Sequence, residues 1–527
     1  MLILKMGETL KEFARLGRNT IRLSLAWMVC WTLLMPSGSS AQSELLEASI
    51  EELQGWLAGG EITSVELVDW YLQRIDAYDQ QGPSLNAIQH LNEKARDQAR
   101  ELDEERELSG PRSLLHGIPV LIKDNYETLD APTTAGSAIL DGHWPKQDAM
   151  QVAKLKEAGA IVLAKTTMHE FAFGWTTRGS AFGVTRNPYG IDRHPGGSSG
   201  GTGAAVAANF AAAGMGSDTC GSIRVPSAHN NLVGLRGTRG ISSRHGIVPL
   251  SSSFDVGGPL ARNTRDLAIM LDATVGYDPL DPQTTESFGK IPDSYLAALR
   301  QIDMDEVKIG VLSDWFGDQP EQAVVNEQIQ RVLKVLEEAG ATIIQLTSPA
   351  LKSLRAETSA DDAYFIDTYD LKKEVTDYLR QYPALPVQSF AEVANDERLE
   401  NSVAVLWKGY LDSRFDSRET YLEYHAKGVQ IRRQLLALYN DNDIDILVYP
   451  TATEEAVPLN LEQEHNNCKL APTSGLPAIS VPAGFGKDGM PVAIELMAEP
   501  WAEQKLLDFA YTIEQLAPAR ELPKHTP

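Results

Sequence analysis

Between residues 195 and 226 the chain reads PGGSSGGTG (195–203) and, after an alanine-rich segment, GSDTCGSIRVP (216–226). Two serines of this stretch, Ser198 and Ser222, lie 24 residues apart in glycine-rich surroundings. Glycine adopts positive φ freely and lets another backbone or a ligand approach closely. A serine in such a segment exposes its hydroxyl beside several backbone N–H groups. These are the components that acyl transfer requires, namely a nucleophile and donors for an oxyanion.

Short apolar runs alternate with helical patterns along much of the chain. The run GIPVLI (117–122) precedes a helical pattern and a second run, IVLA (161–164). The same order returns over residues 307–346, and two further runs are typical of buried strands, 445–449 and 478–481. Strands interleaved with helices favour an α/β fold, with a large mixed, mostly parallel β-sheet covered by helices on both faces.

A lysine, Lys123, directly follows the apolar run 117–122. At its ordinary pKa of about 10.4 a lysine is charged at neutral pH and cannot accept a proton. Burial disfavours the charged form and can lower the pKa of a lysine into the neutral range. A buried Lys123 could therefore serve as the base of an acyl-transfer site that contains no histidine.

Other serine motifs in the chain lack the context that their function requires. Residues 197–201 match the G-x-S-x-G nucleophile elbow of α/β-hydrolases, which would make Ser199 the nucleophile. That elbow needs a strand directly before the serine, whereas residues 186–195 are typical of a loop. A phosphate-binding loop is excluded because no Gly-Lys-Ser/Thr follows the glycines. Ser287 and Lys290 have the Ser-x-x-Lys spacing of penicillin-binding enzymes, but the matching Lys-Thr-Gly is absent.

Taken together, these segments resemble the amidase signature family over nearly the whole chain after residue 42. Besides the two serine segments, the resemblance rests on GIPVLIKDN (117–125), PTTAGS (132–137), PT (450–451), GLPAISVPAG (475–484) and DGMP (488–491). Their order and number make the match far more specific than a single glycine-rich pattern. The resemblance implies one amidase domain over residues 42–527 that hydrolyses a carboxamide C–N bond without a metal or cofactor.

The resemblance also implies a Ser-Ser-Lys catalytic triad. Ser222 would be the nucleophile that forms the acyl-enzyme, and Lys123 would be the base. Ser198, on a cis peptide bond, would relay the proton from Ser222 to Lys123 and return it to the leaving amine. Lys165 also follows an apolar run, but it lacks the Lys-Asp-Asn context of residues 123–125, and we interpret it as structural.

Around the expected nucleophile, the resemblance implies that backbone N–H groups of residues 219–222 bind the oxyanion. The oxyanion and substrate-binding residues that it indicates are Thr219, Cys220, Gly221 and Ala172. The family usually has glycine where this chain has Cys220, so a side chain there should narrow the acyl pocket or its entrance. Asp218 and Arg224 flank the nucleophile, and we expect them to form a structural pair that orients the loop.

Three cysteines are present, of which Cys30 lies in the N-terminal region. Cys468 lies shortly before the segment 475–484, and a buried small residue is the simplest interpretation of it. Whether Cys220 and Cys468 form a disulfide cannot be deduced, because the sequence does not show that their Cα atoms approach within about 7 Å.

The first 41 residues have the pattern of a secretory signal peptide. Basic residues precede an apolar run, 23–35, and small residues lead up to Ala41. An uncleaved anchor helix is the alternative, although the run is shorter than the roughly 20 residues that span a bilayer. We expect cleavage after Ala41 and a periplasmic or secreted protein.

The charge of the chain restricts its partners. The formal net charge is −25, and loss of residues 1–41, which carry five positive and two negative side chains, would change it to −28. Nucleic acids and anionic membrane surfaces are therefore poor partners, and no stable membrane partner is expected. No Cys/His cluster has metal-site spacing. We expect a small-molecule or peptide amide as substrate and a monomer or homodimer.

Two functional alternatives remain open. A glutaminase-type amidotransferase subunit would use the same chemistry with protein partners, and a catalytically dead binding protein would keep the fold alone. The tyrosine-rich segment 351–440 is expected to be a helical lid or specificity segment. Its residues do not translate into one acyl group, so peptide C-terminal, aryl and aliphatic amides all remain possible substrates.

Overall fold

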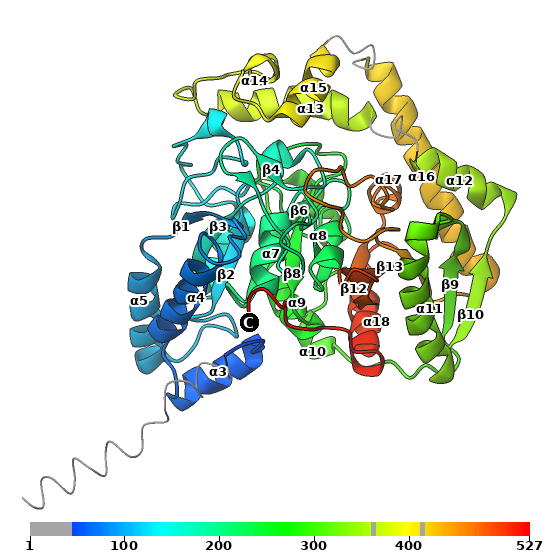
Figure 1. Cartoon of the computed structure of the whole chain (residues 1–527), viewed down its shortest axis with the longest axis horizontal. Coiled ribbons are helices and arrows are strands. Elements are labelled where there is room, and N and C mark those ends of the chain that lie inside the picture. Colours follow the sequence, from blue (N-terminus) through cyan, green and yellow to red (C-terminus); the bar gives the residue numbers. More distant parts are fainter. Residues whose placement is uncertain (1–44, 360–364, 412–416) are drawn as a thin grey trace, which may run out of the picture. The chain divides into compact units, whose positions relative to one another are not determined.

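The computed structural model describes residues 45–359, 365–411 and 417–527 (Figure 1). Residues Ser49–Pro527 form one compact unit, and all elements described below belong to it. The signal peptide expected over residues 1–41 lies outside the described residues. Among the helices within these ranges, none is long and apolar enough to cross a membrane.

Eleven of the described strands form one large sheet, in the order β1-β3-β2-β6-β8-β7-β12-β13-β11-β9-β10. Their bounds are β1 (Ile88–Leu91), β2 (Pro119–Lys123), β3 (Ile161–Thr166), β6 (Ala213–Asp218), β7 (Val233–Arg236), β8 (Val256–Ala261), β9 (Lys308–Leu312), β10 (Thr342–Leu346), β11 (Ile446–Pro450), β12 (Ala478–Phe485) and β13 (Pro491–Met497). A separate ribbon pairs β4 (Arg178–Gly179) with β5 (Gly183–Val184).

The α/β fold with a large mixed sheet is confirmed, but the expected predominance of parallel pairing is not found. Of the ten pairings described in this sheet, only β2–β3, β2–β6, β9–β10 and β9–β11 are parallel. Buried strands carry similar apolar runs in either direction, so composition alone does not reveal their orientation. The short turn between β12 and β13 contains Asp488-Gly489 and can join only antiparallel neighbours.

Helices cover the sheet along its length and extend beyond it. The α-helices are α3 (Ile50–Gly59), α4 (Ser64–Tyr78), α5 (Ala95–Ser109), α6 (Met150–Glu157), α7 (Gly200–Ala207), α8 (Arg224–His229), α9 (Thr264–Thr274), α10 (Tyr295–Ala298), α11 (Ala323–Glu338), α12 (Pro349–Ser359), α13 (Phe365–Arg380), α14 (Phe390–Asn395), α15 (Asn401–Leu411), α16 (Arg418–Asn442), α17 (Leu470–Ser474) and α18 (Glu503–Leu516). Short 3-10 helices are η1 (Ala138–Leu140), η2 (Glu170–Ala172), η3 (Pro282–Ser287), η4 (Ser313–Trp315) and η5 (Pro320–Gln322).

Helix α7 packs unusually closely on the central strands. It contacts β2 and β6, and all of its residues are buried. A Cβ atom at Gly214 of β6 would lie 2.5 Å from Cγ2 of Thr202 in α7, so this approach requires glycine. The glycine- and alanine-rich segment therefore serves first to seat a helix against the sheet, with Ser198 and Ser199 immediately before it.

The strand pairing brings the expected catalytic segments to one edge of the sheet. Strands β2 and β6 are parallel neighbours, with Ile122 opposite Met215. Their carboxyl ends, Lys123 and Asp218, therefore lie at the same edge. Ser222 lies in the turn between β6 and α8, at the edge where β2 also ends.

The segment 351–440 contains helices α12 to α16. In Figure 1, α13, α14 and α15 lie together in yellow, and α16 runs from their side toward β9 and β10. A buried apolar cluster joins α13, α14 and α15 to the region around Ala172. Members of the cluster from the helices are Leu371, Val375, Tyr378, Val403 and Trp407, and those from the rest of the chain include Ile139, Met168 and Phe171.

Candidate active site

Lys123, the last residue of β2, is completely buried. Its Nζ donates to Ser198 Oγ at 2.7 Å and to Ser217 Oγ at 2.9 Å. Within the described part of the chain it forms no ion pair with a carboxylate. Burial lowers the pKa of Lys123 to about 7, although Asp218 and Asp255 act in the opposite direction. A large fraction of this amine is therefore neutral at physiological pH, as a general base requires.

Ser198 lies between Lys123 and the turn that carries Ser222. The peptide bond between Gly197 and Ser198 is cis. The backbone N–H of the next residue, Ser199, donates to the carbonyl oxygen of Ser222 at 3.2 Å. This bond holds the segment that carries Ser198 against the segment that carries Ser222. In the described structure, no hydrogen bond joins the two hydroxyls directly.

The turn that carries Ser222 is organised by Asp218. One carboxylate oxygen of Asp218 accepts from the backbone N–H of Gly221 at 2.7 Å, and the other accepts from that of Ile223 at 3.2 Å. Gly221 has a φ of +82°, and a Cβ there would lie 2.5 Å from Cβ of Cys468. Both the backbone conformation and the close approach therefore require glycine at residue 221.

Two buried arginines hold Asp218 in its charged form. Arg224 donates to Asp218 at 3.1 Å and to Glu495 at 2.5 Å, and Arg236 donates to Asp218 at 3.1 Å. Burial by itself would raise the pKa of Asp218, but Arg224 and Arg236 lower that pKa well below its usual range. The Asp218–Arg224 pair is therefore part of a buried network behind the nucleophile, and it does not line the cavity that contains Ser222.

Ser222 lines a cavity of about 400 Å³. Its hydroxyl forms no hydrogen bond with any described residue, so it is available to a molecule in the cavity. No charged side chain lines this cavity among the described residues. The lining residues are Ala172, Phe173, Gly174, Trp175, Thr219, Cys220, Ser222, Leu250, Leu406 and Tyr410. The space beside Ser222 therefore favours an apolar or aromatic group.

The expected oxyanion residues lie in or beside the turn that carries Ser222, but their N–H groups differ in the hydrogen bonds that they already form. The N–H of Gly221 is already bound to Asp218, whereas those of Thr219 and Ser222 form no hydrogen bond with any described residue. Ala172 lines the cavity and has a φ of +60°, next to Phe171 with a φ of +49°. Positive φ at residues other than glycine is unfavourable and is often retained at functional sites.

Two residues that compete with the expected triad have structural partners. Ser199 is fully buried, and its hydroxyl donates to the backbone carbonyl of Ser217 at 3.2 Å. Lys165 is also fully buried, but its Nζ lies 3.1 Å from a carboxylate oxygen of Asp124. Among the described residues, Ser199 does not line the cavity that contains Ser222, and Lys165 has a carboxylate partner whereas Lys123 has none.

A second, more polar cavity of about 210 Å³ lies on the other side of Thr219. It shares Ala172, Thr219 and Leu250 with the first cavity and also reaches Ser217, a partner of Lys123. Its walls include Arg244, which is paired with Asp281 at 2.7 Å, and Glu374, whose pKa is raised to about 7 by burial. An apolar and a polar cavity therefore adjoin each other beside the turn that carries Ser222.

Cys220 and Cys468 form a disulfide, a question that the sequence left open. Their Cα atoms lie 5.1 Å apart, and both residues belong to a small buried cluster with Val225. The bond ties the nucleophile turn to the segment before α17. Trp175 reinforces the turn from the cavity side, because its indole N–H donates to the carbonyl oxygen of Cys220 at 2.9 Å.

Sequence reasoning missed several residues of the site. Ser217 binds the amine of Lys123, and Asn125 donates to Ser217 Oγ at 2.9 Å. Both lie inside the sequence segments that carry the family resemblance. Their closeness in the chain to Lys123 and Ser222 was the signal that could have identified them. Leu406 and Tyr410 line the cavity from α15, and no pattern in their helix indicates that contact. In contrast, Tyr369 stacks on Tyr421, and Tyr364 lies outside the described residues.

The family model Amidase matches residues 66–507, and the chain belongs to this family. The resemblance to amidase signature enzymes is therefore confirmed. A glutamyl-tRNA(Gln) amidotransferase subunit from Thermoanaerobacter pseudethanolicus is 34% identical over 499 residues, which is 90% of this chain and 97% of that protein.

Solved structures with the same fold include two proteins of different function. The native peptide amidase from Stenotrophomonas maltophilia matches with a TM-score of 0.82 and 32% identity, over 91% of this chain and 99% of that chain. The corresponding glutamyl-tRNA(Gln) amidotransferase subunit from Thermotoga maritima matches with a TM-score of 0.70 and 28% identity, over 91% and 98%. The family therefore supports an amide hydrolase or an amidotransferase.

The expected periplasmic or secreted location is contradicted by these relatives. Curated proteins similar to the chain are named as subunits of a glutamyl-tRNA(Gln) amidotransferase. Aminoacyl-tRNA, the substrate in that name, is not available outside the cell. The inference of export from the basic and then apolar N-terminal pattern was therefore wrong.

The network behind the nucleophile predicts a large effect of Asp218→Asn on stability. The substitution preserves size but leaves the buried Arg224 and Arg236 without their shared carboxylate. Loss of one partner of a buried ion pair typically costs about 3–5 kcal/mol. Urea unfolding should show this decrease, whereas Asp97→Asn, which breaks an exposed pair with Arg100, should change stability little. Equal stability of the two variants would contradict the role given to Asp218.

Proposed function

We propose that this protein is an amidase that hydrolyses a carboxamide with an apolar or aromatic acyl group, through an acyl-enzyme on Ser222. The observation that carries the proposal is the buried Lys123, which has a pKa of about 7 and contacts Ser198. Ser222 lines an uncharged cavity beside this pair. The N–H groups of Thr219 and Ser222 are the donors proposed for the oxyanion.

In the proposed reaction, Ser222 Oγ attacks the carbonyl carbon of the amide. Ser222 passes its proton to Ser198 as Ser198 passes its own to neutral Lys123. The C–N bond then breaks, and the proton returns through Ser198 to the leaving nitrogen, which departs as ammonia or an amine. Water repeats the sequence on the resulting ester and releases the carboxylate. The relay requires the Ser222 hydroxyl to turn toward Ser198, and such contacts commonly tighten when substrate binds.

The segment 351–440 is proposed to act as a specificity segment within the domain 42–527. Leu406 and Tyr410 of α15 line the cavity that contains Ser222. The same helix contributes Trp407 to the cluster that includes Phe171 and Ala172. A change in α15 would therefore alter both the wall of the cavity and the backbone beside it.

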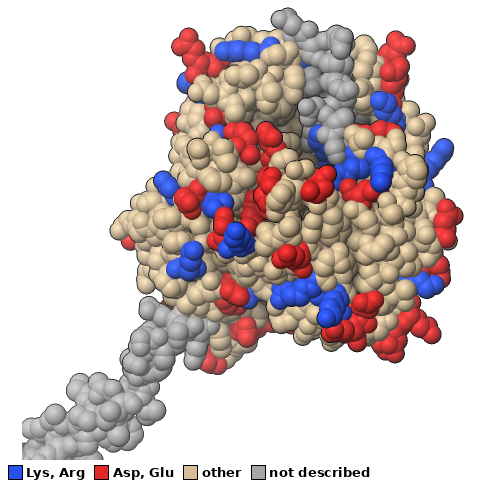
Figure 2. Space-filling model, turned by 45° about the vertical axis from the view of Figure 1, so that its right-hand side comes forward, with Lys and Arg blue, Asp and Glu red and all other residues tan. Residues whose placement is uncertain are grey.

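A glutaminase-type amidotransferase subunit is the second candidate function, favoured by the names of the curated relatives. Such a subunit would release ammonia from glutamine and would act with a partner protein. Free glutamine carries a carboxylate and an ammonium group, and burying them without partners is costly. The cavity around Ser222 has no charged lining residue among those described, and Arg244 of the adjoining polar cavity is already paired with Asp281, which favours the amidase. On the face in Figure 2, acidic and basic side chains are interspersed among the described residues, without the broad basic area typical of tRNA binding.

The proposed nucleophile predicts that Ser222→Ala reduces kcat below detection, because no acyl-enzyme can form. Ser199→Ala is the matched control, since Ser199 is the serine that the nucleophile-elbow motif would select. It should retain most of the activity. Intact-mass measurement after treatment with a fluorophosphonate should show one adduct on the wild type and on Ser199→Ala, and none on Ser222→Ala. An adduct on Ser222→Ala would place the nucleophile elsewhere, and an inert wild type would support a catalytically dead protein.

The pKa of Lys123 predicts a pH dependence with a definite sign. The base acts in its neutral form, and its pKa is lowered by burial, so the neutral fraction rises as pH increases through about 7. We expect kcat/KM to increase about tenfold per pH unit below 7 and to level off above it. Lys123→Met should lose activity at every pH. A profile that is flat from pH 5.5 to 8.5 would contradict the assignment of the base.

A substrate panel separates the two candidate functions. Because the cavity is uncharged, ammonia release from apolar and aromatic carboxamides should exceed release from glutamine by at least about 100-fold in kcat/KM. Tyr410→Ala should reduce the preference for aromatic amides, while Tyr424→Ala, outside this cavity, should not. Preference for glutamine, particularly if stimulated by a partner protein, would favour the amidotransferase subunit.

A further inference from the structure

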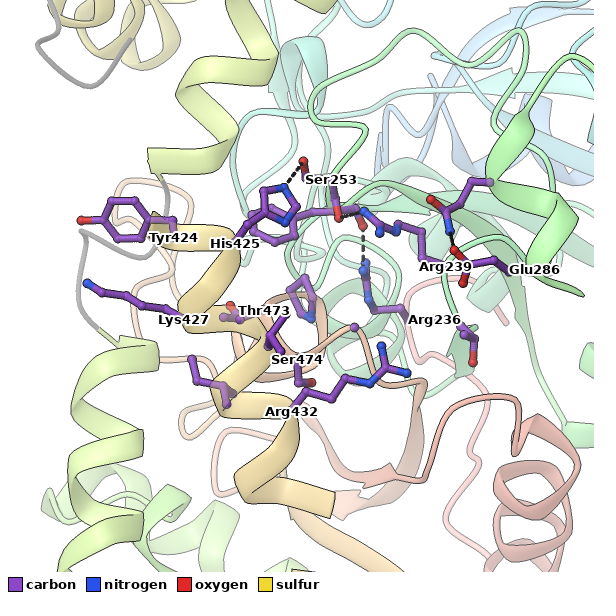
Figure 3. Close-up of a pocket in the computed structure, with 18 of the residues that line it drawn as sticks. Arg236, Arg239, Ser253, Glu286, Tyr424, His425, Lys427, Arg432, Thr473 and Ser474 are labelled. Carbon is purple, nitrogen blue, oxygen red and sulfur yellow. Dashed lines mark hydrogen bonds between the residues drawn. The ribbon is translucent and has the colours of Figure 1, made fainter. Parts of the chain in front are cut away.

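A separate cavity of about 310 Å³ lies between α16, α17 and the loops that follow β7 and precede β8 (Figure 3). It has no lining residue in common with the cavity that contains Ser222. The cavity lies beside the network of Asp218, because Arg236 belongs to both.

Three arginine side chains gather in this cavity. Figure 3 shows the guanidinium group of Arg236 between those of Arg239 and Arg432, which come from the loop after β7 and from α16. Lys427 also lines the cavity, but its side chain extends away from the three arginines and its Nζ lies over the ring of Tyr424. The positive charge is therefore concentrated on the guanidinium groups.

These guanidinium groups have unused hydrogen-bond donors. Arg432 is half-buried and forms no hydrogen bond or ion pair with any described residue. Arg239 is half-buried and uses only Nη1, which donates to the backbone carbonyl of Ser253 at 2.6 Å. Arg236 is 2% exposed, and its Nε is buried without a partner. Burial lowers the pKa of Arg239, which indicates an unfavourable environment for an unpaired cation.

The two carboxylates that line the cavity have hydrogen-bond partners other than its arginines. Glu286 accepts from Gln283 at 2.7 Å, and Glu357 accepts from Ser353 at 3.2 Å. Among the described residues, neither forms an ion pair with Arg239 or Arg432. Arg236 is paired with Asp218, so its charge is already compensated. In a chain with a formal net charge of −25, the two remaining arginines, Arg239 and Arg432, with free donors in one cavity indicate a site for an external anion.

We propose that this cavity binds a small organic dicarboxylate. The forked donors of Arg239 and Arg432 match one carboxylate each, and the two residues enter the cavity from different elements. The walls also offer apolar surface for a short hydrocarbon body, from Phe254, Ile431, Pro472 and Trp501. A bare inorganic anion would leave most of the 310 Å³ and this apolar surface unused.

Calorimetric titration with glutarate, a five-carbon dicarboxylate, tests this inference without reference to catalysis. We expect saturable binding of one glutarate per chain. Arg239→Gln and Arg432→Gln should each weaken it at least about tenfold, as expected for loss of a charged hydrogen-bonding partner. The matched control is Arg433→Gln, on the exposed side of α16 next to Arg432, and it should bind like the wild type. Melting curves identify any variant that fails to fold.

Several results would overturn the proposal. Glutarate binding that is unchanged in both arginine variants would place the ligand elsewhere. Equal affinity for butyrate, the matched monocarboxylate, would contradict the requirement for two carboxylates. Binding of inorganic phosphate without binding of glutarate would show a simple anion site. Because the titration does not use Ser222, it can succeed or fail independently of the proposed amidase activity.

Discussion

Lys123 is buried without a carboxylate partner in the described part of the chain, and the proposed chemistry depends on this constraint. Lys123 and Lys165 end or nearly end neighbouring parallel strands, and both are fully buried. Burial lowers the pKa of each, but Asp124, 3.1 Å from Lys165, stabilises that lysine as a cation. The hydroxyls of Ser198 and Ser217 give Lys123 polar contacts without a compensating charge. Of two similar buried lysines, Lys165 therefore has an ion-pair partner, and Lys123 has the uncharged contacts on which the proposed base depends.

The rest of the site holds the turn that carries Ser222 in place. Asp218 shapes the turn through the N–H groups of Gly221 and Ile223, and two buried arginines keep its carboxylate charged. The disulfide between Cys220 and Cys468 joins the same turn to a distant segment. Arg236 binds Asp218 and also lines the cavity that contains Arg239 and Arg432. A ligand in that cavity would therefore lie beside a residue that supports the turn carrying Ser222.

Much of this arrangement follows from local sequence signals. The apolar run before Lys123 and the glycines around Ser198 and Ser222 indicate a strand end and close backbone approach, and both are present. Strand orientation did not follow, because buried strands have the same composition in either direction. The contact of Leu406 and Tyr410 with the cavity and the pairing of Cys220 with Cys468 depend on tertiary packing between segments far apart in the chain. No local periodicity carries that information.

The most direct test of the central claim is the pKa of Lys123 itself. Lysine labelled with ¹³C at Cε can be followed by NMR across the pH range in Ser222→Ala protein, with Lys123→Met to assign the signal. The account predicts a titration near pH 7, far below that of the exposed lysines. A Lys123 signal that titrates above pH 10 would mean that the amine is a cation at neutral pH, and the proposed base would have to be abandoned.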